Sequence, residues 1–215
     1  MDLLLVRCAD LESDGRPKLV DELVPAPTVS RDAMACGLSE RGEKHSRRLA
    51  TWLKGHAPRQ LQIFSSPAKG ARQMAGLIAD GIGDELGKNA LPPIVSRLLG
   101  PEANASDVLG AVGWPHDHHA ALVVAHQPAL GALASLLLTG QETPLSFKRG
   151  AIWWFSSRHR GYELQTVLRC ALMPDLLNGS GRSGKAEAVE PVAGLSLEFP
   201  DVVDLVRMRL GGVGA

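Results

Sequence analysis

Three short apolar runs separated by helical patterns constrain the fold of this chain more than any other feature. The runs cover residues 3–6, 61–64 and 121–125, and Gln62 is the one polar residue within them. Such a run is typical of a strand that is buried on both of its faces. Strands of this kind that alternate with helices form βαβ units, so the sequence predicts a mostly parallel sheet with helices on both faces.

Three helical patterns lie between and after these runs. The first begins after Ser39, a favourable N-cap residue, and stops at Gly55. The second covers residues 67–80, and the third starts at Pro128 and continues through Leu138. The expected fold class is therefore α/β, a three-layer sandwich in which helices cover both sides of the sheet.

Two later segments predict a hairpin that is added to this sheet. They cover residues 151–155 and 162–168 and flank a short polar turn around residues 158–161. Residues 152–155 are one isoleucine and three aromatic residues, and residues 162–168 include Tyr162, Thr166 and Val167, residue types that favour strands. We therefore expect the sheet to gain two further strands at the end of the domain.

The composition changes after Pro174, which divides the chain into a domain at 1–174 and a tail at 175–215. Residues 178–184 contain glycine, serine, asparagine and arginine alone and form a flexible linker by composition. Residues 200–210 carry five aliphatic side chains on one potential helical face. We expect this short helix to dock on its own domain or on a second copy of the chain, forming a homodimer.

Charge and cysteine content exclude several classes of protein. Lys plus Arg and Asp plus Glu both number 23, which argues against a nucleic-acid binder. No apolar stretch reaches the roughly 18 residues of a membrane span, so no membrane association is expected. The three cysteines form no CxxC pair, so neither a zinc site nor a disulfide framework is expected, and no other metal or cofactor is predicted. Unpaired cysteines favour a reducing, cytoplasmic location. The His-rich residues 116–119 are interpreted as a solvated turn.

Polar residues follow all three buried strands at the end where parallel sheets bind ligands. They are Arg7 and Cys8 after the first strand, Ser66 after the second and His126 after the third. Each has an ordinary alternative: an arginine in a surface ion pair, a cysteine that fills a small apolar space at the strand end, a serine that caps a helix, and a histidine bonded to a backbone carbonyl. Together, a guanidinium fork and groups beside helix N-termini predict a pocket for phosphate.

Four segments in this order resemble the histidine phosphatase superfamily, whose fold is phosphoglycerate mutase-like. They are Leu-Leu-Val-Arg-Cys-Ala at 4–9, Leu-Ser-Glu-Arg-Gly at 38–42, Ser-Ser-Pro-Ala-Lys-Gly-Ala-Arg-Gln-Met-Ala at 65–75, and Val-Val-Ala-His-Gln-Pro at 123–128. The resemblance covers residues 1 to about 168. Within the superfamily, the short length and the Trp-Leu-Lys at 52–54 resemble the bacterial SixA-type phosphohistidine phosphatases.

The resemblance implies roles for the residues that match the pattern. In this superfamily a histidine after the first strand attacks phosphorus, and two arginines and a second histidine bind the phosphoryl oxygens. Arg7 and His126 match the first arginine and the second histidine, and Ser66 lies in the segment that lines the site. Cys8 stands where the nucleophilic histidine is expected, so Cys8 and His126 are the implied catalytic residues.

A second departure concerns the other arginine of the pattern. Its place falls on Gly70, and the nearest cations in sequence are Lys69 and Arg72. These two are the implied substitutes in phosphate binding, although the point charge of a lysine does not reproduce a bidentate fork.

These departures leave several functions open. The first is a phosphatase acting on phosphohistidine or another phosphorylated group, carried by a small molecule or a phosphoprotein. The second, which we favour from the sequence, is a phosphate-binding pseudoenzyme with weak or absent turnover, and the third is an interaction module. A Cys8 thiolate is an alternative nucleophile. Its sulfur lies roughly 1.5 Å closer to the backbone than an imidazole nitrogen, and a misplacement of about 1 Å can lower a rate by on the order of a hundredfold.

Overall fold

The computed structural model describes residues 1–12, 34–58, 60–86, 92–116, 119–160 and 163–177. Within them lies a six-stranded sheet in the order β3-β2-β4-β1-β5-β6. The strands are β1 (Asp2–Arg7), β2 (Leu61–Ser65), β3 (Ile94–Val95), β4 (Ala120–Ala125), β5 (Ile152–Arg160) and β6 (Glu163–Leu172). The first four are parallel, and β5 and β6 add an antiparallel pair beside β1. The mostly parallel α/β sheet that the sequence predicts is confirmed.

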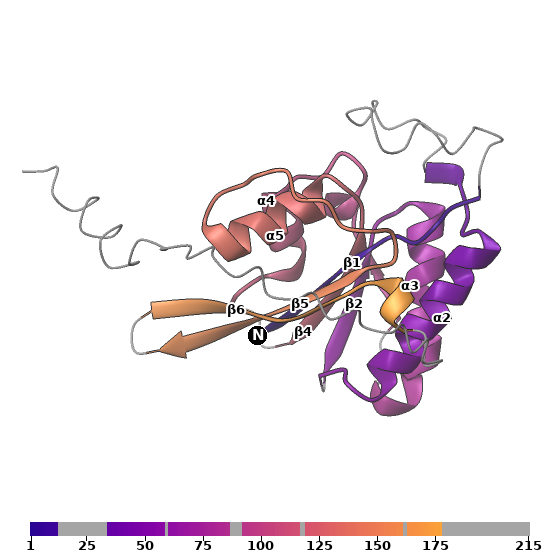
Figure 1. Ribbon diagram of the computed structural model, residues 1–215, viewed down its shortest axis with the longest axis horizontal. Helices are drawn as coiled ribbons and strands as arrows, with labels where there is room; N and C mark the ends of the chain where they lie inside the picture. Colours follow the sequence, from indigo (N-terminus) through magenta and orange to yellow (C-terminus); the bar gives the residue numbers. More distant parts are fainter. Residues whose placement is uncertain (13–33, 59, 87–91, 117–118, 161–162, 178–215) are drawn as a thin grey trace, which may run out of the picture. The chain divides into compact units, whose positions relative to one another are not determined.

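Helices cover both faces of this sheet (Figure 1). Helices α2 (Glu40–Lys54) and α3 (Lys69–Leu86) pack on one face, and α4 (Ala105–Val112) and α5 (Ala129–Thr139) pack on the other. Short 3-10 turns, η2 (Arg97–Leu99) and η3 (Pro174–Leu177), complete the described elements. The arrangement is the expected three-layer sandwich.

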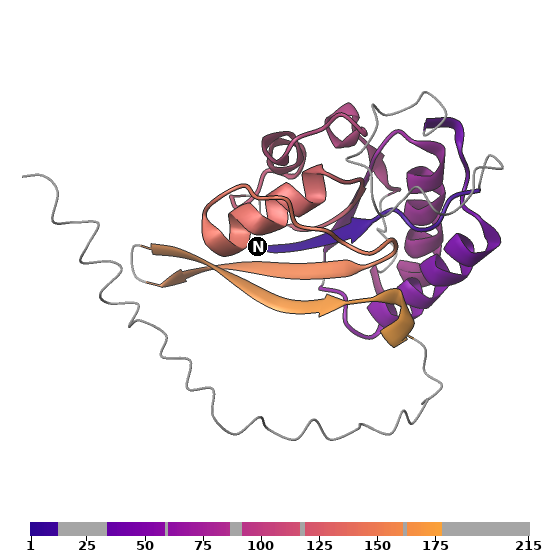
Figure 2. The same cartoon turned by 45° about the horizontal axis from the view of Figure 1, so that its top comes forward.

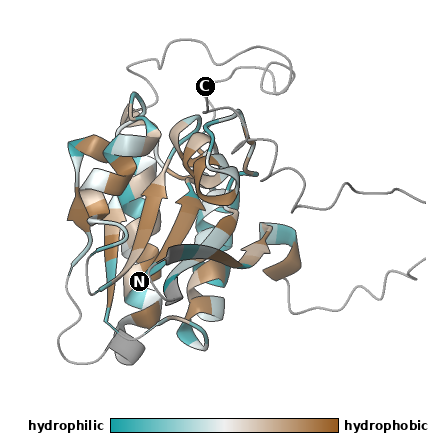
Figure 3. Ribbon diagram, turned by 90° about the vertical axis from the view of Figure 1, so that its left-hand side faces the viewer, coloured by the Kyte–Doolittle hydropathy of each residue, from teal (hydrophilic) through white to brown (hydrophobic). Residues whose placement is uncertain are grey.

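Strand β1 shows why the central strands have continuous apolar sequences. Leu4 and Val6 point into the core beneath α2 and α3, whereas Leu3 and Leu5 point into the core beneath α4 and α5. All four side chains are fully buried. Because each side chain of such a strand enters one of two cores, alternation with polar residues is lost. Figure 3 shows these hydrophobic strands in brown between the helical layers.

Helix α2 begins where the sequence predicts it. The hydroxyl of Ser39 accepts a hydrogen bond from the backbone N–H of Gly42 at 3.1 Å, and Glu40 and Glu43 place negative charge in the first turn. The face of the helix that carries Leu49 and Leu53 is buried against the sheet. The cap thus fixes the start of the helix beside the loop that follows β1.

The hairpin of β5 and β6 is confirmed, and it is longer than predicted (Figure 2). Pairing continues from Ile152 with Leu172 to Arg160 with Glu163, so residues 158–160, expected in a turn, belong to β5. Pairing with β6 provides hydrogen-bond partners for the backbone N–H and C=O groups of β5, so polar residues can extend this strand. The turn itself, residues 161–162, lies outside the described residues.

Two helical segments differ from the sequence prediction. Helix α3 continues past Asp80 to Leu86, because Ile82 supplies another fully buried side chain. Helix α4 was not predicted; it is short, and a capping box between Asn104 and Asp107 fixes its N-terminus.

The linker at 178–184 and the helix at 200–210 lie outside the described residues. The division into 1–174 and 175–215, like the docking of the tail, therefore stays a prediction. Among the described helices, none combines the length and the apolar character needed to cross a bilayer.

Candidate functional site

Three polar strand ends meet at one edge of the sheet. The order β2-β4-β1 makes these strands neighbours, and the register pairs Arg7 with Ala125. The backbone N–H of Cys8 continues this pairing by donating to the carbonyl of Ala125 at 2.9 Å. The residues that leave the three ends are Ser66, His126 and Cys8. The predicted convergence of the strand ends is confirmed.

Arg7 is held on both sides of its backbone. Its N–H donates to the carbonyl of Ala151 at 3.1 Å, and its carbonyl accepts from the N–H of Gly150 at 3.0 Å. The guanidinium donates through Nη1 to the carbonyl of Phe147. This bond helps to fix the direction of the guanidinium.

His126 and Ser66 form a polar pair directly after β4 and β2. Nε2 of His126 lies 3.0 Å from the hydroxyl of Ser66, and that hydroxyl accepts the N–H of Ala68 at 3.3 Å. Burial lowers the pKa of His126 to about 4, with help from the positive charges of Arg7 and Arg149. The imidazole is therefore neutral at neutral pH.

Cys8 is buried, with 5% of its surface exposed. Burial raises the pKa of its thiol to about 12, and the guanidinium groups of Arg149 and Arg7 oppose this rise without overcoming it. The thiol is consequently protonated at neutral pH. A protonated thiol is a poor nucleophile, because the thiolate is the reactive form.

Arg149 is the charged residue of this site that sequence reasoning missed. It lies in the connection between α5 and β5, and its charge acts on both Cys8 and His126. No motif surrounds it. The available signal is the glycine that follows: Gly150 has a φ of 74°, the left-handed conformation that favours glycine, and it marks a turn directly before a strand.

A cavity of about 260 Å³ adjoins the site at Arg149. Within it, Nε of Arg41 lies 3.3 Å from Oδ2 of Asp10, and Nδ1 of His45 lies 3.9 Å from the same oxygen. Burial lowers the pKa of His45. The lining residues are Asp10, Arg41, His45, Lys148, Arg149, Pro174 and Asp175.

Histidine, cysteine and carboxylate side chains form no metal-binding group of three or more within the part of the chain that the structure describes. Residues 117 and 118 of the His-rich segment 116–119 lie outside that part. Their interpretation as a solvated turn stays a prediction.

No protein-family model matches the sequence, and no curated protein matches it at a significant level. Solved structures do match. The protein histidine phosphatase SixA, determined with tungstate, is 23% identical, with a TM-score of 0.61 over 82% of this chain and 99% of that chain. A SixA structure from Agrobacterium tumefaciens is 17% identical, with a TM-score of 0.55 over 80% and 98% of the two chains. A phosphoserine phosphatase variant from Entamoeba histolytica, bound to phosphoserine, is 15% identical, with a TM-score of 0.52 over 80% and 97%.

This chain has the fold of the histidine phosphatases. The sequence resemblance therefore predicts the correct fold, and Cys8 stands at the end of the first strand of that fold. Position 70, where the pattern has its second arginine, faces Cys8: a Cβ atom on Gly70 would lie 3.6 Å from Sγ of Cys8. It would also lie 2.3 Å from Cδ2 of Leu11, so the leucine fills the space that a side chain at position 70 would need.

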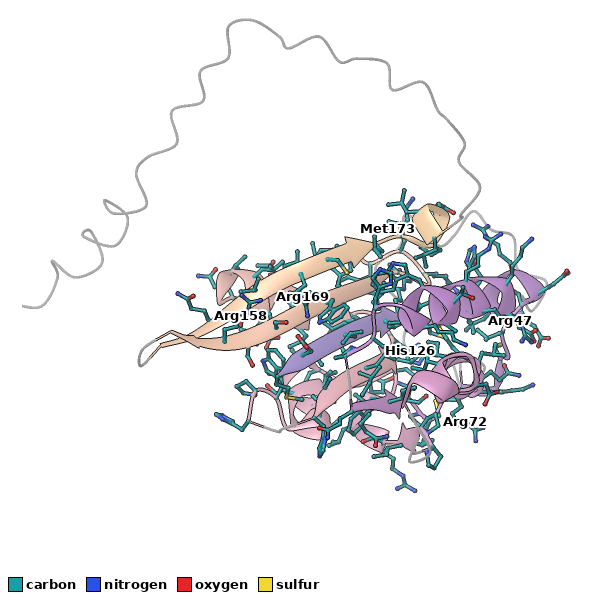
Figure 4. All side chains as sticks on the ribbon, turned by 90° about the horizontal axis from the view of Figure 1, so that it is seen from below. Arg47, Arg72, His126, Arg158, Arg169 and Met173 are labelled. Carbon is teal, nitrogen blue, oxygen red and sulfur yellow. The ribbon has the colours of Figure 1, made fainter. Side chains whose placement is uncertain are left out.

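Lys69 and Arg72 do not join the group of charges around Cys8 and His126. Both side chains are exposed on α3, and Figure 4 labels Arg72 there. The cations that shift the pKa values of Cys8 and His126 are Arg7 and Arg149. A phosphate-binding role for Lys69 and Arg72 thus stays a prediction, and no contact among the described residues supports it.

Gly42 controls how the loop after Cys8 packs on α2. A Cβ atom there would lie 2.1 Å from the backbone carbonyl oxygen of Asp10, which accepts hydrogen bonds from the N–H and hydroxyl of Ser39 at 3.0 and 3.1 Å. We expect Gly42→Ala to displace this backbone and lower the free energy of unfolding by about 1–3 kcal/mol, measured by urea denaturation.

The matched control is Gly76→Ala, also within a helix, where an added Cβ meets nothing within 4 Å. This change should raise the free energy of unfolding by about 0.5–1 kcal/mol, because alanine favours helix. Equal changes in the free energy of unfolding of the two variants would show that close packing against Asp10 does not require glycine at position 42.

Proposed function

We propose that this chain binds phosphoryl groups between Arg7, Ser66 and His126 and hydrolyses them slowly or not at all. The observation that carries the proposal is the state of Cys8: a buried, protonated thiol stands where histidine phosphatases are expected to have their nucleophile. In this proposal Arg7, Ser66 and His126 bind the anion, and no side chain supplies an efficient nucleophile.

Binding of an oxyanion is supported by the charges at this edge of the sheet. Arg7 and Arg149 both act on the small region around Cys8 and His126, and a bound dianion would relieve their mutual repulsion. A guanidinium donates in a planar fork that matches two phosphate oxygens. The neutral imidazole of His126 supplies one N–H donor, and anion binding would raise its pKa and favour the doubly donating cation.

Turnover through a Cys8 thiolate, the alternative nucleophile, is not supported. With a pKa of about 12, roughly one thiol in 10⁵ is ionised at pH 7. A phosphoryl group bound beside the sulfur adds negative charge and raises that pKa further. The residue is also buried, so attack on phosphorus would need both ionisation of the thiol and access to the ligand.

The phosphoryl group that binds here is carried by a small molecule or by a phosphoprotein. A phosphorylated small molecule and a phosphoprotein present the same oxyanion to Arg7 and His126, and both are retained as ligands. The described cysteines are free thiols, which agrees with the reducing, cytoplasmic location that we propose.

Binding of inorganic phosphate, measured by isothermal titration calorimetry, tests the proposal. We expect the full chain to bind phosphate and Arg7→Met to bind it at least about tenfold more weakly, because the fork is lost. Arg158→Met is the control, since Arg158 lies on the β5–β6 hairpin away from His126 (Figure 4).

Turnover is assayed in parallel with phosphohistidine and p-nitrophenyl phosphate. Absence of phosphate binding by the unmodified chain would contradict the proposal. So would rapid hydrolysis that Cys8→Ser abolishes, because that result would identify Cys8 as a working nucleophile.

A further inference from the structure

A tight turn fastens residues 148–151 to the end of β1. The N–H of Ala151 donates to the carbonyl of Lys148 at 3.0 Å, and Gly150 adopts the left-handed conformation at the turn's third position. The same turn makes two backbone hydrogen bonds with Arg7, one through Gly150 and one through Ala151. Arg149 occupies the corner of this turn, so its Cα is fixed relative to Arg7.

The neighbouring contacts fix Arg149 from its other side. Two residues before it, the carbonyl of Phe147 accepts a hydrogen bond from the guanidinium of Arg7. One residue after it, a Cβ atom on Gly150 would lie 3.8 Å from the Cβ of Ala9, which follows Cys8. The segment therefore wraps the strand end on which Arg7 and Cys8 lie, and Arg149 is held beside both.

The side chain of Arg149 is oriented differently from that of its neighbour. Lys148 is exposed, whereas Arg149 is partly buried. Both line the adjoining cavity, and only Arg149 acts electrostatically on Cys8 and His126. Arg149 lowers the pKa of Cys8 more than Arg7 does, whereas Arg7 lowers the pKa of His126 more than Arg149 does. Two guanidinium groups from different segments thus act on the same two residues, Cys8 and His126.

Position 70 supplies no cation to the site, because it is a glycine. At Gly70, the position on α3 that faces Cys8, Cδ2 of Leu11 occupies the space for a side chain, and the N–H of Gly70 donates to the carbonyl of Cys36 at 3.0 Å. A second guanidinium can therefore approach Cys8 from the turn at 148–151 and not from position 70.

We propose that Arg149 is the second phosphoryl-binding guanidinium of this site, delivered by the turn before β5. This inference rests on the proposed function, which it deepens. Arg7 and Arg149 approach from adjacent segments and together present two planar forks, so that a phosphoryl group receives donors on two sides. Charge alone does not describe this role, because a lysine cannot supply the second fork.

Calorimetric titration of the full chain with inorganic phosphate tests the inference. We expect Arg149→Met to weaken phosphate binding at least about tenfold and Arg149→Lys to give an intermediate affinity. Lys148→Met removes the same charge one residue away and should bind within about twofold of the unmodified chain. Equal weakening in Lys148→Met and Arg149→Met would overturn the assignment, because it would indicate a general effect of net charge.

The titration of His126, followed by NMR in the absence of phosphate, provides a readout that a merely structural role would not give. In Arg149→Met the pKa of His126 should rise, because one of the two cations that lower it is gone, while Lys148→Met should leave it unchanged.

The outcomes also separate this inference from the proposed function. If Arg149→Met binds phosphate as tightly as the unmodified chain while Arg7→Met does not, Arg149 does not bind the phosphoryl group and the proposed function is unaffected. If the unmodified chain binds no phosphate, both are overturned.

Discussion

Replacing Cys8 by histidine is expected to raise hydrolysis of p-nitrophenyl phosphate by at least about a hundredfold at pH 7. The thiol of Cys8 is protonated there because burial raises its pKa to about 12. A neutral imidazole keeps an available lone pair, and its nitrogen reaches roughly 1.5 Å further from the backbone. The measurement is the initial rate per enzyme, with the unmodified chain and Cys8→Ser assayed beside it.

Cys8→Ser is the matched control, because a hydroxyl is similar in size to a thiol and does not ionise at pH 7. It should show no gain. The gain in Cys8→His should largely disappear in the double variant with Arg149→Met, because nucleophile and second guanidinium act on one transition state and their effects are not additive. A folded Cys8→His that still binds phosphate yet gains no activity would show that the missing nucleophile is not what limits turnover.

Acid is expected to destabilise the folded chain through His126 by about 3 kcal/mol between pH 6.5 and pH 4. Burial, together with Arg7 and Arg149, lowers the pKa of His126 from 6.5 to about 4 in the folded state. Between these two values the unfolded chain binds a proton that the folded chain does not, so the free energy of unfolding falls as the pH falls. Urea denaturation at several pH values measures this slope.

His126→Gln isolates the contribution of this one group, since glutamine preserves a hydrogen-bonding partner for Ser66 without titrating. The difference between the two chains should grow as the pH falls and should vanish above about pH 7. Phosphate should reduce the difference, because a bound anion raises the pKa of His126. The same pH dependence in both chains would show that His126 titrates normally in the folded state.

Local patterns were sufficient for the elements that form the site. The apolar runs that became β1, β2 and β4 enter two cores, so their sequences are apolar except for Gln62 and are easy to recognise. Ser39 and Pro128 mark helix starts through short-range chemistry that depends on a few neighbouring residues. Since parallel strands end at a common edge, the meeting of Arg7, Ser66 and His126 follows from the order of elements alone.

Other features depended on contacts between distant residues. The extension of α3 past Asp80 follows from the burial of Ile82, and the extension of β5 to Arg160 follows from its pairing with β6. The polar residues of these two segments do not by themselves predict a helix or a strand. Packing against the core and pairing with β6 stabilise the two extensions.

By itself, the sequence determined the α/β class, the histidine phosphatase resemblance and the position of Cys8 where a nucleophile is expected. Only the tertiary structure decided what that position can do. Arg149 is remote from Arg7 in sequence, and backbone bonds from the turn at 148–151 bring it beside Cys8. The pKa values of Cys8 and His126 follow from burial and from two guanidinium groups, which are properties of the folded surroundings and not of residue type. Local spacing encodes strands and caps, whereas the electrostatics of a site arise from everything that packs around it.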